Sequence, residues 1–321
     1  MQGRLTRALW IAAAFLHLAA VLALFVVFDL RPKTGWAAFL LYSPRLPFTL
    51  PALITFIALR GAWRLLPALT AAIVLGPLMG LHVNGPGRAG SLRLVTWNVW
   101  LGAGDPEVVR ATLLRANPDL VLFQAAAHRV DVVLKEAPFS GFTYLHEDQY
   151  VLASRWPARV VQSGDPSGGW RPWVRFAVDS PWGTMDVFSV HPHSPRSLLR
   201  GSVRRGMQGE RPEMDSLESD LTEIDELVRH GGPLMVVAGD FNVPERAGIL
   251  MGMFGGTEDA FAAAGNGYGY TFPALGKRGR MPPWLRLDRV LTGARLRATR
   301  AEVVAGRGSD HAALVVDLAP R

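Results

Sequence analysis

The chain has 321 residues, a formal net charge of +7 and a pI of about 10.3. It contains no cysteine, which excludes disulfides and thiolate chemistry, and a zinc site would have to use histidines and carboxylates. The length allows one large domain and a smaller unit. The basic charge is compatible with a phosphate-bearing partner, such as nucleic acid or a lipid head group, or simply with exposed arginines.

The first 90 residues differ in composition from the rest of the chain. Asp29 is their only acidic residue, and alanine, leucine, valine and phenylalanine dominate. They end in the turn-rich stretch Gly85-Pro86-Gly87-Arg88-Ala89-Gly90, which is typical of a linker. We therefore predict a membrane segment over residues 1–84, a linker over 85–90 and a globular domain over 91–321.

Three apolar segments are predicted to cross the membrane. Leu9–Phe28 is uncharged, long enough to span a ~30 Å hydrocarbon core, and too long for the apolar region of a signal peptide. Trp36–Leu59 is interrupted by Arg45 and by two prolines, so it is the weakest span and is expected to be re-entrant or broken. Leu65–Val83 is the third.

Charges that flank these segments predict their orientation. Two arginines precede the first segment and two separate the second from the third, namely Arg4, Arg7, Arg60 and Arg64. The connection between the first and second segments carries two basic residues and Asp29. Because cytoplasmic loops carry an excess of lysine and arginine, the amino terminus is expected in the cytoplasm. We predict a multi-pass membrane protein whose globular domain lies outside the cytoplasm.

From residue 92 onward, apolar runs of strand length alternate with helical patterns. Strands are predicted at 92–97, 119–123, 150–153, 174–178, 185–190, 234–238, 268–272, 285–291, 301–304 and 312–317. Helices are predicted after Asp105, at 126–137 and at 216–230, the last with a clear apolar side. The elements predict an α/β (α+β) four-layer sandwich, in which two packed, mainly antiparallel sheets are flanked by helices.

Polar side chains cluster where several predicted strands end. Gly239-Asp240-Phe241-Asn242 directly follows the apolar run 234–238, and its Asp and Asn lie two residues apart, hence on the same face. Similar clusters end other strands: Thr96-Trp97-Asn98-Val99, residues 119–124, Val190-His191, Leu287-Asp288-Arg289-Val290 and Ser309-Asp310-His311.

This ordered set resembles the endonuclease/exonuclease/phosphatase superfamily, which has the DNase I-like fold, over roughly residues 91–318. The resemblance implies a hydrolase of phosphoesters that depends on Mg²⁺ or Mn²⁺. Such a cation neutralises the non-bridging oxygens of the substrate and prefers carboxylate, amide and water ligands. By the same resemblance, Asn98 and Asp310 would help to hold the metal.

The resemblance also implies roles in acid–base chemistry and phosphate contact. Asp240 would orient or deprotonate the attacking water, and Asn242 and His191 would contact the phosphate. His311 would contact the phosphate or transfer a proton, oriented by Asp288.

One position departs from the family pattern. The family has Gln-Glu after the second strand, and the Glu is its principal metal ligand, but here the residues are Gln124-Ala125. Ala125 cannot bind a cation, and Gln124 is expected to point to the opposite face. Either a divergent lineage has lost the ligand, leaving a weak enzyme or a binding protein, or a Glu was deliberately replaced by Ala to inactivate the enzyme. We favour the second explanation because the other motif positions are intact.

Two substrate classes fit these motifs. Nucleic acid would need basic residues, which Arg155, Arg171, Arg175, Arg204, Arg205 and Arg211 offer. A lipid or other envelope phosphoester is slightly favoured by the short linker and by tryptophans in predicted loops, which suit a membrane interface unless they are core residues. These are Trp156, Trp170, Trp173, Trp182 and Trp284. Arg155 and Trp284 are the predicted substrate-binding residues, and Trp284 is predicted to lie near the site. A non-catalytic receptor for phosphate-bearing ligands is the third alternative.

Overall fold

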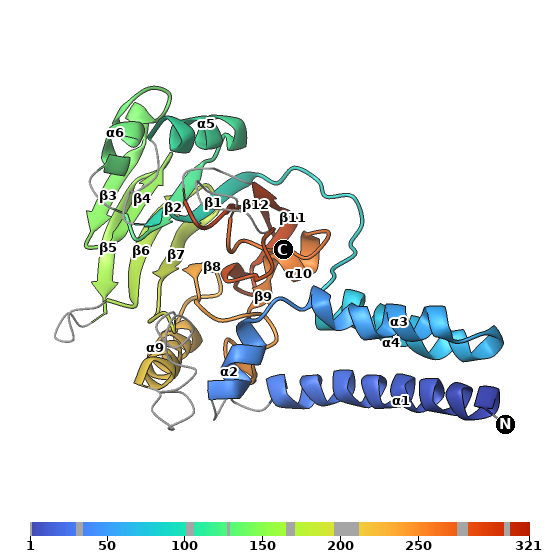
Figure 1. Ribbon diagram of the computed structural model, residues 1–321. Coiled ribbons are helices and arrows are strands. Elements are labelled where there is room, and N and C mark those ends of the chain that lie inside the picture. Colours follow the sequence, from blue (N-terminus) through green and yellow to red (C-terminus); the bar gives the residue numbers. More distant parts are fainter. Residues whose placement is uncertain are drawn as a thin grey trace.

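The computed structural model describes residues 2–29, 35–100, 106–126, 129–164, 171–195, 212–274, 282–304 and 309–321. Strands form the centre of the globular domain, and a bundle of helices projects from one side of it (Figure 1). The projecting helices and the domain are therefore distinct in shape, although they contact each other (Figure 1).

Two six-stranded sheets form the domain. The first has the order β11-β12-β1-β2-β4-β3, with β1 (Leu92–Asn98), β2 (Leu120–Gln124), β3 (Thr143–Glu147), β4 (Tyr150–Ser154), β11 (Leu296–Val304) and β12 (Ala313–Pro320). The second has the order β5-β6-β7-β8-β10-β9, with β5 (Ala158–Ser163), β6 (Trp173–Ser180), β7 (Gly183–Val190), β8 (Met235–Asp240), β9 (Glu258–Asp259) and β10 (Asp288–Thr292). One pair in each sheet is parallel, β1 with β2 and β7 with β8, and the others are antiparallel. The predicted pair of mainly antiparallel sheets is confirmed.

Alternation of side chains divides each strand between two layers of core. In β1, Leu94 belongs to the core between the sheets, whereas Val95 packs under α5 (Pro106–Ala116) and α6 (Arg129–Lys135). The outer face of the second sheet is covered by α9 (Pro212–Arg229), whose apolar stripe includes the fully buried Leu217 and Leu221. A short helix, α10 (Ala260–Ala264), follows β9. The order helix, sheet, sheet, helix is the predicted four-layer sandwich.

Some element bounds differ from the prediction. The helix expected at 126–137 corresponds to α6, which the structure describes over Arg129–Lys135. The strand expected at 268–272 is wrong, because Gly267 and Gly269 have φ of +88° and +64°, which extended strands do not adopt. In place of a strand the segment has an isolated bridge between Phe272 and Leu285.

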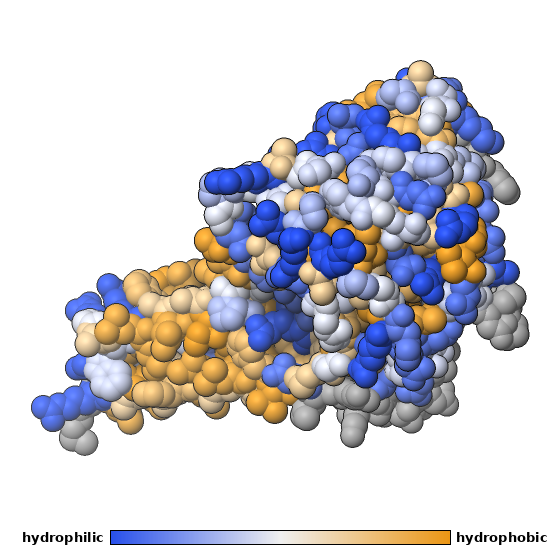
Figure 2. Space-filling view, turned by 180° about the vertical axis from the view of Figure 1, so that it is seen from behind, coloured by the Kyte–Doolittle hydropathy of each residue, from blue (hydrophilic) through white to orange (hydrophobic). Residues whose placement is uncertain are grey.

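The helices of the predicted membrane segment are α1 (Gln2–Asp29), α2 (Gly35–Tyr42), α3 (Leu50–Ala58) and α4 (Leu65–Ile73). Among the described residues, Arg4–Asp29 and Gly61–Leu78 are long and apolar enough to cross a bilayer, and a bent pair of helices would make a third crossing. On the face that Figure 2 shows, hydrophobic residues cover most of these helices and hydrophilic residues gather at their outer end. The amino terminus and the turn from α3 to α4 lie together at the outer end of the bundle (Figure 1).

The second predicted span, Trp36–Leu59, is not one continuous helix. Its two halves, Trp36–Tyr42 and Leu46–Ala58, meet at an angle of 88°. Arg45 lies at the bend, where its Nη1 donates to the carbonyl oxygen of Leu78 over 2.6 Å and its guanidinium lies over the ring of Phe28. The bend thus places this arginine at the junction with the domain and turns α2 against the domain.

Side chains of the domain bind the end of the last helix of the projecting bundle. The Tyr268 and Tyr270 hydroxyls donate to the carbonyl oxygens of Leu75 and Met79, over 2.9 and 2.8 Å. Carbonyls at a helix carboxyl end lack partners inside the helix, so these bonds satisfy groups that would otherwise need water. Residues 85–90 contain no helix or strand, but they are not the only connection between the membrane segment and the domain.

Candidate active site

The carboxyl ends of both parallel strand pairs meet at one end of the sandwich. There Asn98 ends β1, Asp240 ends β8, and His191 follows β7. Gly239 has φ of +149°, and a β-carbon on it would lie 2.0 Å from the backbone oxygen of Val190. Only a residue without a side chain lets β8 run this close to β7. Gly239 therefore brings His191 beside Asp240.

Asp240 is the centre of the cluster and is 1% exposed. The Asn98 Nδ2 donates to its Oδ2 over 2.9 Å, and the Nε2 atoms of His191 and His311 lie 3.7 and 3.5 Å from the same oxygen. The Asn242 backbone N–H donates to Oδ1 over 2.8 Å. Burial acts to raise the pKa of Asp240, but the two imidazoles and the two hydrogen bonds outweigh it and hold this pKa below its ordinary value of 3.8. Asp240 is therefore a buried carboxylate that stays charged at neutral pH.

His311 forms a tight pair with Asp288. Its Nδ1 lies 2.8 Å from the Asp288 Oδ2, and its backbone carbonyl accepts a 2.9 Å hydrogen bond from the Trp97 indole. Burial acts to lower the pKa of His311, but the carboxylates of Asp288 and Asp240 outweigh it and raise this pKa to about 9. At neutral pH the site therefore contains an imidazolium beside Asp240, as expected for a histidine oriented by Asp288.

His191 is oriented by a residue that the sequence analysis missed. The Gln149 Oε1 lies 2.6 Å from the His191 Nδ1, and the Gln149 Nε2 donates to the Arg171 carbonyl over 3.0 Å. Because the amide oxygen can only accept, it selects the tautomer with a proton on Nδ1 and turns Nε2 toward the Asn98 amide, 3.4 Å away. Gln149 belongs to no motif, and its position just before a predicted strand gives no sign of this role.

Asn242 holds the loop that follows β8. Its φ is +53°, in the left-handed region that asparagine tolerates better than most residues. Its backbone N–H caps Asp240, and its Nδ2 donates to the Pro192 carbonyl over 2.9 Å. In this geometry Asn242 links the ends of β7 and β8. The expected contact between its side chain and a phosphate stays a prediction.

A buried group at this site could bind a divalent cation. Asp240, Asp288 and His311 offer ligand atoms that all lie within 4.8 Å of one another. The Asp288 Oδ1 has no hydrogen-bond partner among the described residues, although it is fully buried. Because metal ligands bind in their deprotonated form, a cation here would have to displace the proton of His311.

The residues that the resemblance assigns to the metal are Asn98, Asp310 and position 125, which are not the members of the Asp240, Asp288 and His311 group. The Asn98 Oδ1 accepts a 3.0 Å hydrogen bond from the Trp100 N–H, and Asp310, half-buried, precedes His311. Ala125 has φ of +48° and is 6% exposed. The Gln124 Nε2 donates to the Ser189 hydroxyl over 3.0 Å, between the sheets, so Gln124 points away from the cluster as expected. The methyl group of Ala125 contributes no ligand.

Nearby acids are engaged elsewhere. The Glu147 carboxylate lies 2.5 Å from the Arg171 Nη1 and is held in this ion pair. Of the oxygen donors that the resemblance assigns, the described chain thus retains Asn98 and Asp310.

Arg155 is not part of the cluster, contrary to the prediction that it binds substrate. Its Nε lies 2.6 Å from the Asp119 Oδ1, and its guanidinium lies over the ring of Phe142. Asp119 directly precedes β2, whereas the site lies beyond Gln124 at the other end of that strand. The charge of Arg155 alone does not indicate at which end of the sheet its side chain lies.

The tryptophans differ in their surroundings. Trp173 is buried, and Trp156 and Trp182 pack against the core between the sheets, so the expectation that they face a membrane is wrong. Trp170 lies outside the described residues. Trp284 is half-buried, and its indole donates to the Tyr42 carbonyl over 3.0 Å.

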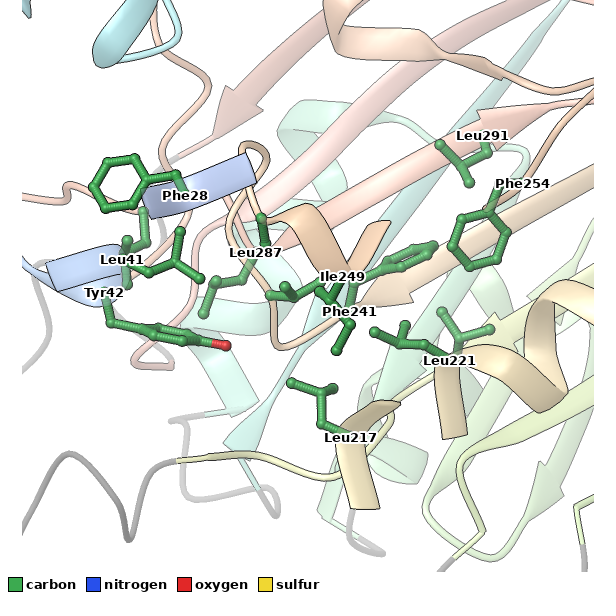
Figure 3. Packing of buried hydrophobic residues seen from close by; sticks show 14 of the residues in the cluster. Phe28, Leu41, Tyr42, Leu217, Leu221, Phe241, Ile249, Phe254, Leu287 and Leu291 are labelled. Carbon is green, nitrogen blue, oxygen red and sulfur yellow. The ribbon is translucent and has the colours of Figure 1, made fainter. Parts of the chain in front are cut away.

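Tyr42 connects α2 to the site. Its hydroxyl donates to the Asn242 carbonyl over 2.7 Å. Figure 3 shows Tyr42 and Leu41 of α2 in one hydrophobic cluster with Leu217 of α9 and with Phe241, the residue between Asp240 and Asn242. The amino-terminal helical segment therefore packs directly beside the loop that follows β8.

With this geometry in place, residues 95–311 match the family described as Endonuclease/Exonuclease/phosphatase, and the chain belongs to this family. Members of the family are hydrolases of phosphoesters. No curated protein matches the chain.

Several solved structures share the fold. A TDP2 from D. rerio, crystallised with a single-strand DNA product, is 14% identical with a TM-score of 0.53, and the match covers 71% of this chain and 98% of that one. An endonuclease/exonuclease/phosphatase family protein from Bacteroides thetaiotaomicron is 15% identical with a TM-score of 0.51, covering 72% and 98%. A mannosyl-6-phosphatase from the same organism is 16% identical with a TM-score of 0.48, covering 71% and 99%. At these identities the likeness to the first two structures establishes the fold alone.

Proposed function

We propose that this chain is a membrane-anchored, divalent-metal-dependent phosphoesterase that acts on a lipid or another envelope phosphoester. The observation that carries the proposal is the buried Asp240, charged and held between two histidines, at the end of β8 and directly before a loop that the amino-terminal helices contact through Asn242. The charged Asp240 between two histidines supports hydrolysis of a phosphoester. The contact with the amino-terminal helices supports a substrate at the bilayer surface.

The residues of the cluster suit the separate tasks of phosphoester hydrolysis. Asp240 would accept a proton from the attacking water, since its carboxylate is ionised and fixed in place. The imidazolium of His311 would place positive charge where negative charge develops on the phosphoryl group. Mg²⁺ or Mn²⁺, held by Asn98 and Asp310, would supply further neutralisation of the phosphoryl oxygens.

The arrangement of charges supports an extracytoplasmic domain. Arg4 and Arg7 lie near the amino terminus, and Arg60 and Arg64 lie at the turn from α3 to α4, so both pairs are at the outer end of the helical bundle (Figure 1). The globular domain lies at the opposite end. Because positive charges favour the cytoplasmic side, the domain is proposed to face away from the cytoplasm.

A nuclease is the second candidate, and it has less support. Arg155, Arg171 and Arg175 were expected to contribute to a basic groove, but each lies within 2.8 Å of a carboxylate, of Asp119, Glu147 and Asp186 respectively. Neutralised arginines attract a phosphate backbone weakly. Arg204, Arg205 and Arg211 lie outside the described residues.

The test is a substrate panel with the full chain in lipid nanodiscs, with Mg²⁺ and Mn²⁺ titrated. The panel compares anionic phospholipids, phosphorylated inositols, single-stranded DNA and RNA. We expect metal-dependent turnover of a lipid or envelope phosphoester, abolished in Asp240→Asn and retained in Arg155→Gln. Faster hydrolysis of DNA or RNA would establish the nuclease instead. Binding without turnover, even after Ala125→Glu, would establish a phosphate receptor.

A further inference from the structure

Tyr42 of the membrane segment contacts the catalytic loop across a sequence separation of 200 residues. Its hydroxyl donates to the Asn242 carbonyl over 2.7 Å, and Tyr42 is 5% exposed. We propose that Tyr42 is a positioning residue of the active site, so that the membrane segment completes the site as well as anchoring it. The kinetic part of this inference rests on the proposed phosphoesterase function, whereas the structural part does not.

Asn242 needs several hydrogen bonds to keep its conformation. A residue other than glycine in the left-handed region is held there by its surroundings, at a cost of about 1 kcal/mol or more. Its N–H binds the Asp240 carboxylate and its side-chain amide binds the Pro192 carbonyl. Tyr42 binds its backbone carbonyl oxygen. The orientation of the Asp240 carboxylate therefore depends on a loop that Tyr42 fixes from outside the domain.

Tyr42 is itself held firmly against the domain. The Trp284 indole donates to its carbonyl over 3.0 Å, and neighbouring Leu41 is 1% exposed in the same hydrophobic cluster as Leu287 (Figure 3). Leu287 directly precedes Asp288. The inner face of α2 therefore packs on two segments that carry catalytic residues.

The outer face of α2 has the opposite character. Trp36 and Phe39 are 52% and 43% exposed, and their rings pack edge to face with centroids 6.1 Å apart. Past the 88° bend the chain continues into α3 of the projecting apolar bundle. Exposed aromatic side chains next to membrane helices suit the lipid head-group region. A force on α2 from the bilayer would be passed to Asn242 through the Tyr42 hydroxyl.

Tyr42→Phe tests the positioning role of Tyr42, because it removes only the hydroxyl oxygen. Tyr270→Phe is its matched control. The control removes the same kind of hydrogen bond at the same junction, to Met79, without touching the catalytic loop. Both variants of the full chain are compared in nanodiscs by amide hydrogen exchange of a peptide covering residues 239–245 and by steady-state kinetics.

We expect the exchange of this peptide to rise several-fold in Tyr42→Phe and to stay unchanged in Tyr270→Phe. One buried hydrogen bond contributes about 0.5–1.5 kcal/mol, so kcat should fall by roughly 2- to 10-fold while KM stays constant. Trp284→Phe removes the indole donor to Tyr42 and should change exchange in the same direction, which provides a second variant if Tyr42→Phe folds poorly.

Equal exchange in both tyrosine variants, whether unchanged or raised alike, would overturn the positioning role, because the hydroxyl would then have no specific effect on the loop. A rise in KM at constant kcat would overturn it too. If no variant hydrolyses any substrate but the exchange responds as expected, the positioning role stands and the proposed function fails.

Discussion

Asp288 lies directly opposite Asp240 in the antiparallel pairing of β10 with β8, and His311 contacts both carboxylates. The strand register alone brings the two acids to the same level of the sheet. The Nδ1 of His311 then reaches Asp288 over 2.8 Å and its Nε2 lies 3.5 Å from Asp240. A positive imidazolium between two buried acids satisfies charges that burial would otherwise make costly.

The first prediction concerns pH. The folded pKa of His311, about 9, is above its ordinary value of 6.5, so the protonated form stabilises the folded state. This stabilisation is fully present below pH 6.5 and is lost as the pH rises through about 9. The pKa difference corresponds to a contribution on the order of 3 kcal/mol. We expect the melting temperature to fall between pH 7 and pH 10, less so in His311→Gln, and an NMR titration of His311 near pH 6.5 would contradict the prediction.

The second prediction is that Asp288→Asn lowers the pKa of His311 and reduces kcat by about 10²- to 10⁴-fold, the range for a disabled acid–base group. The substitution keeps the shape of the side chain but removes the charge that favours the imidazolium. Asp220→Asn is a suitable control because Asp220 pairs with His193, 2.7 Å away, outside the cluster. Titration of His311 by NMR and steady-state kinetics measure the two effects, and an unchanged His311 pKa would rule out this role of Asp288.

The third prediction is that Gly239→Ala destabilises the domain by about 2–3 kcal/mol and abolishes activity, because the new β-carbon would meet the Val190 backbone oxygen. The strands β7 and β8 would have to separate, moving His191 away from Asp240. Gly252→Ala is the control, since Gly252 also has a positive φ, +80°, but no atom within 4 Å of the added β-carbon. Thermal unfolding should show a clearly larger loss for Gly239→Ala, and equal losses would mean that backbone strain, not the clash, sets the effect.

Much of the fold and the cluster could be predicted because local signals agreed with the tertiary structure. Asn98 and Asp240 end β1 and β8, and Asp288 begins β10, which is antiparallel to β8, so the topology brings all three to one end of the two sheets. The amphipathic pattern of 216–230 similarly predicted the helix that covers the second sheet.

Other features depend on contacts that the sequence does not encode locally. Gln149 orients His191 from a position with no motif, and Tyr42 reaches Asn242 from a segment whose apolar composition indicated only a membrane span. Arg155 was misplaced because its charge is neutralised by Asp119 at the far end of β2. In each case the determining interaction joins residues far apart in the chain.

The last prediction concerns Ala125. Its backbone has a left-handed conformation, φ +48°, directly after the end of β2. The side chain at this position offers no metal ligand. Mg²⁺ usually binds proteins through one or two carboxylates and retains several waters. With Asn98 and Asp310 as the remaining donors, we expect the chain to bind a phosphoester but to hydrolyse it slowly.

Ala125→Glu should restore metal-dependent hydrolysis by several orders of magnitude, if stabilisation of the transition state by the metal is the main contribution. Asp240→Asn in that restored background should abolish hydrolysis again, because the attacking water would lose the carboxylate that accepts its proton.

Ala125→Gln is the matched control, since it adds similar bulk at a position only 6% exposed without adding a charge. Isothermal titration with Mn²⁺ should show tighter binding for the Glu variant alone, in parallel with the rates. If the chain with Ala125 already turns over a substrate at an ordinary enzymatic rate, another residue supplies the ligand, and the buried Asp240, Asp288 and His311 group is the place to look for it.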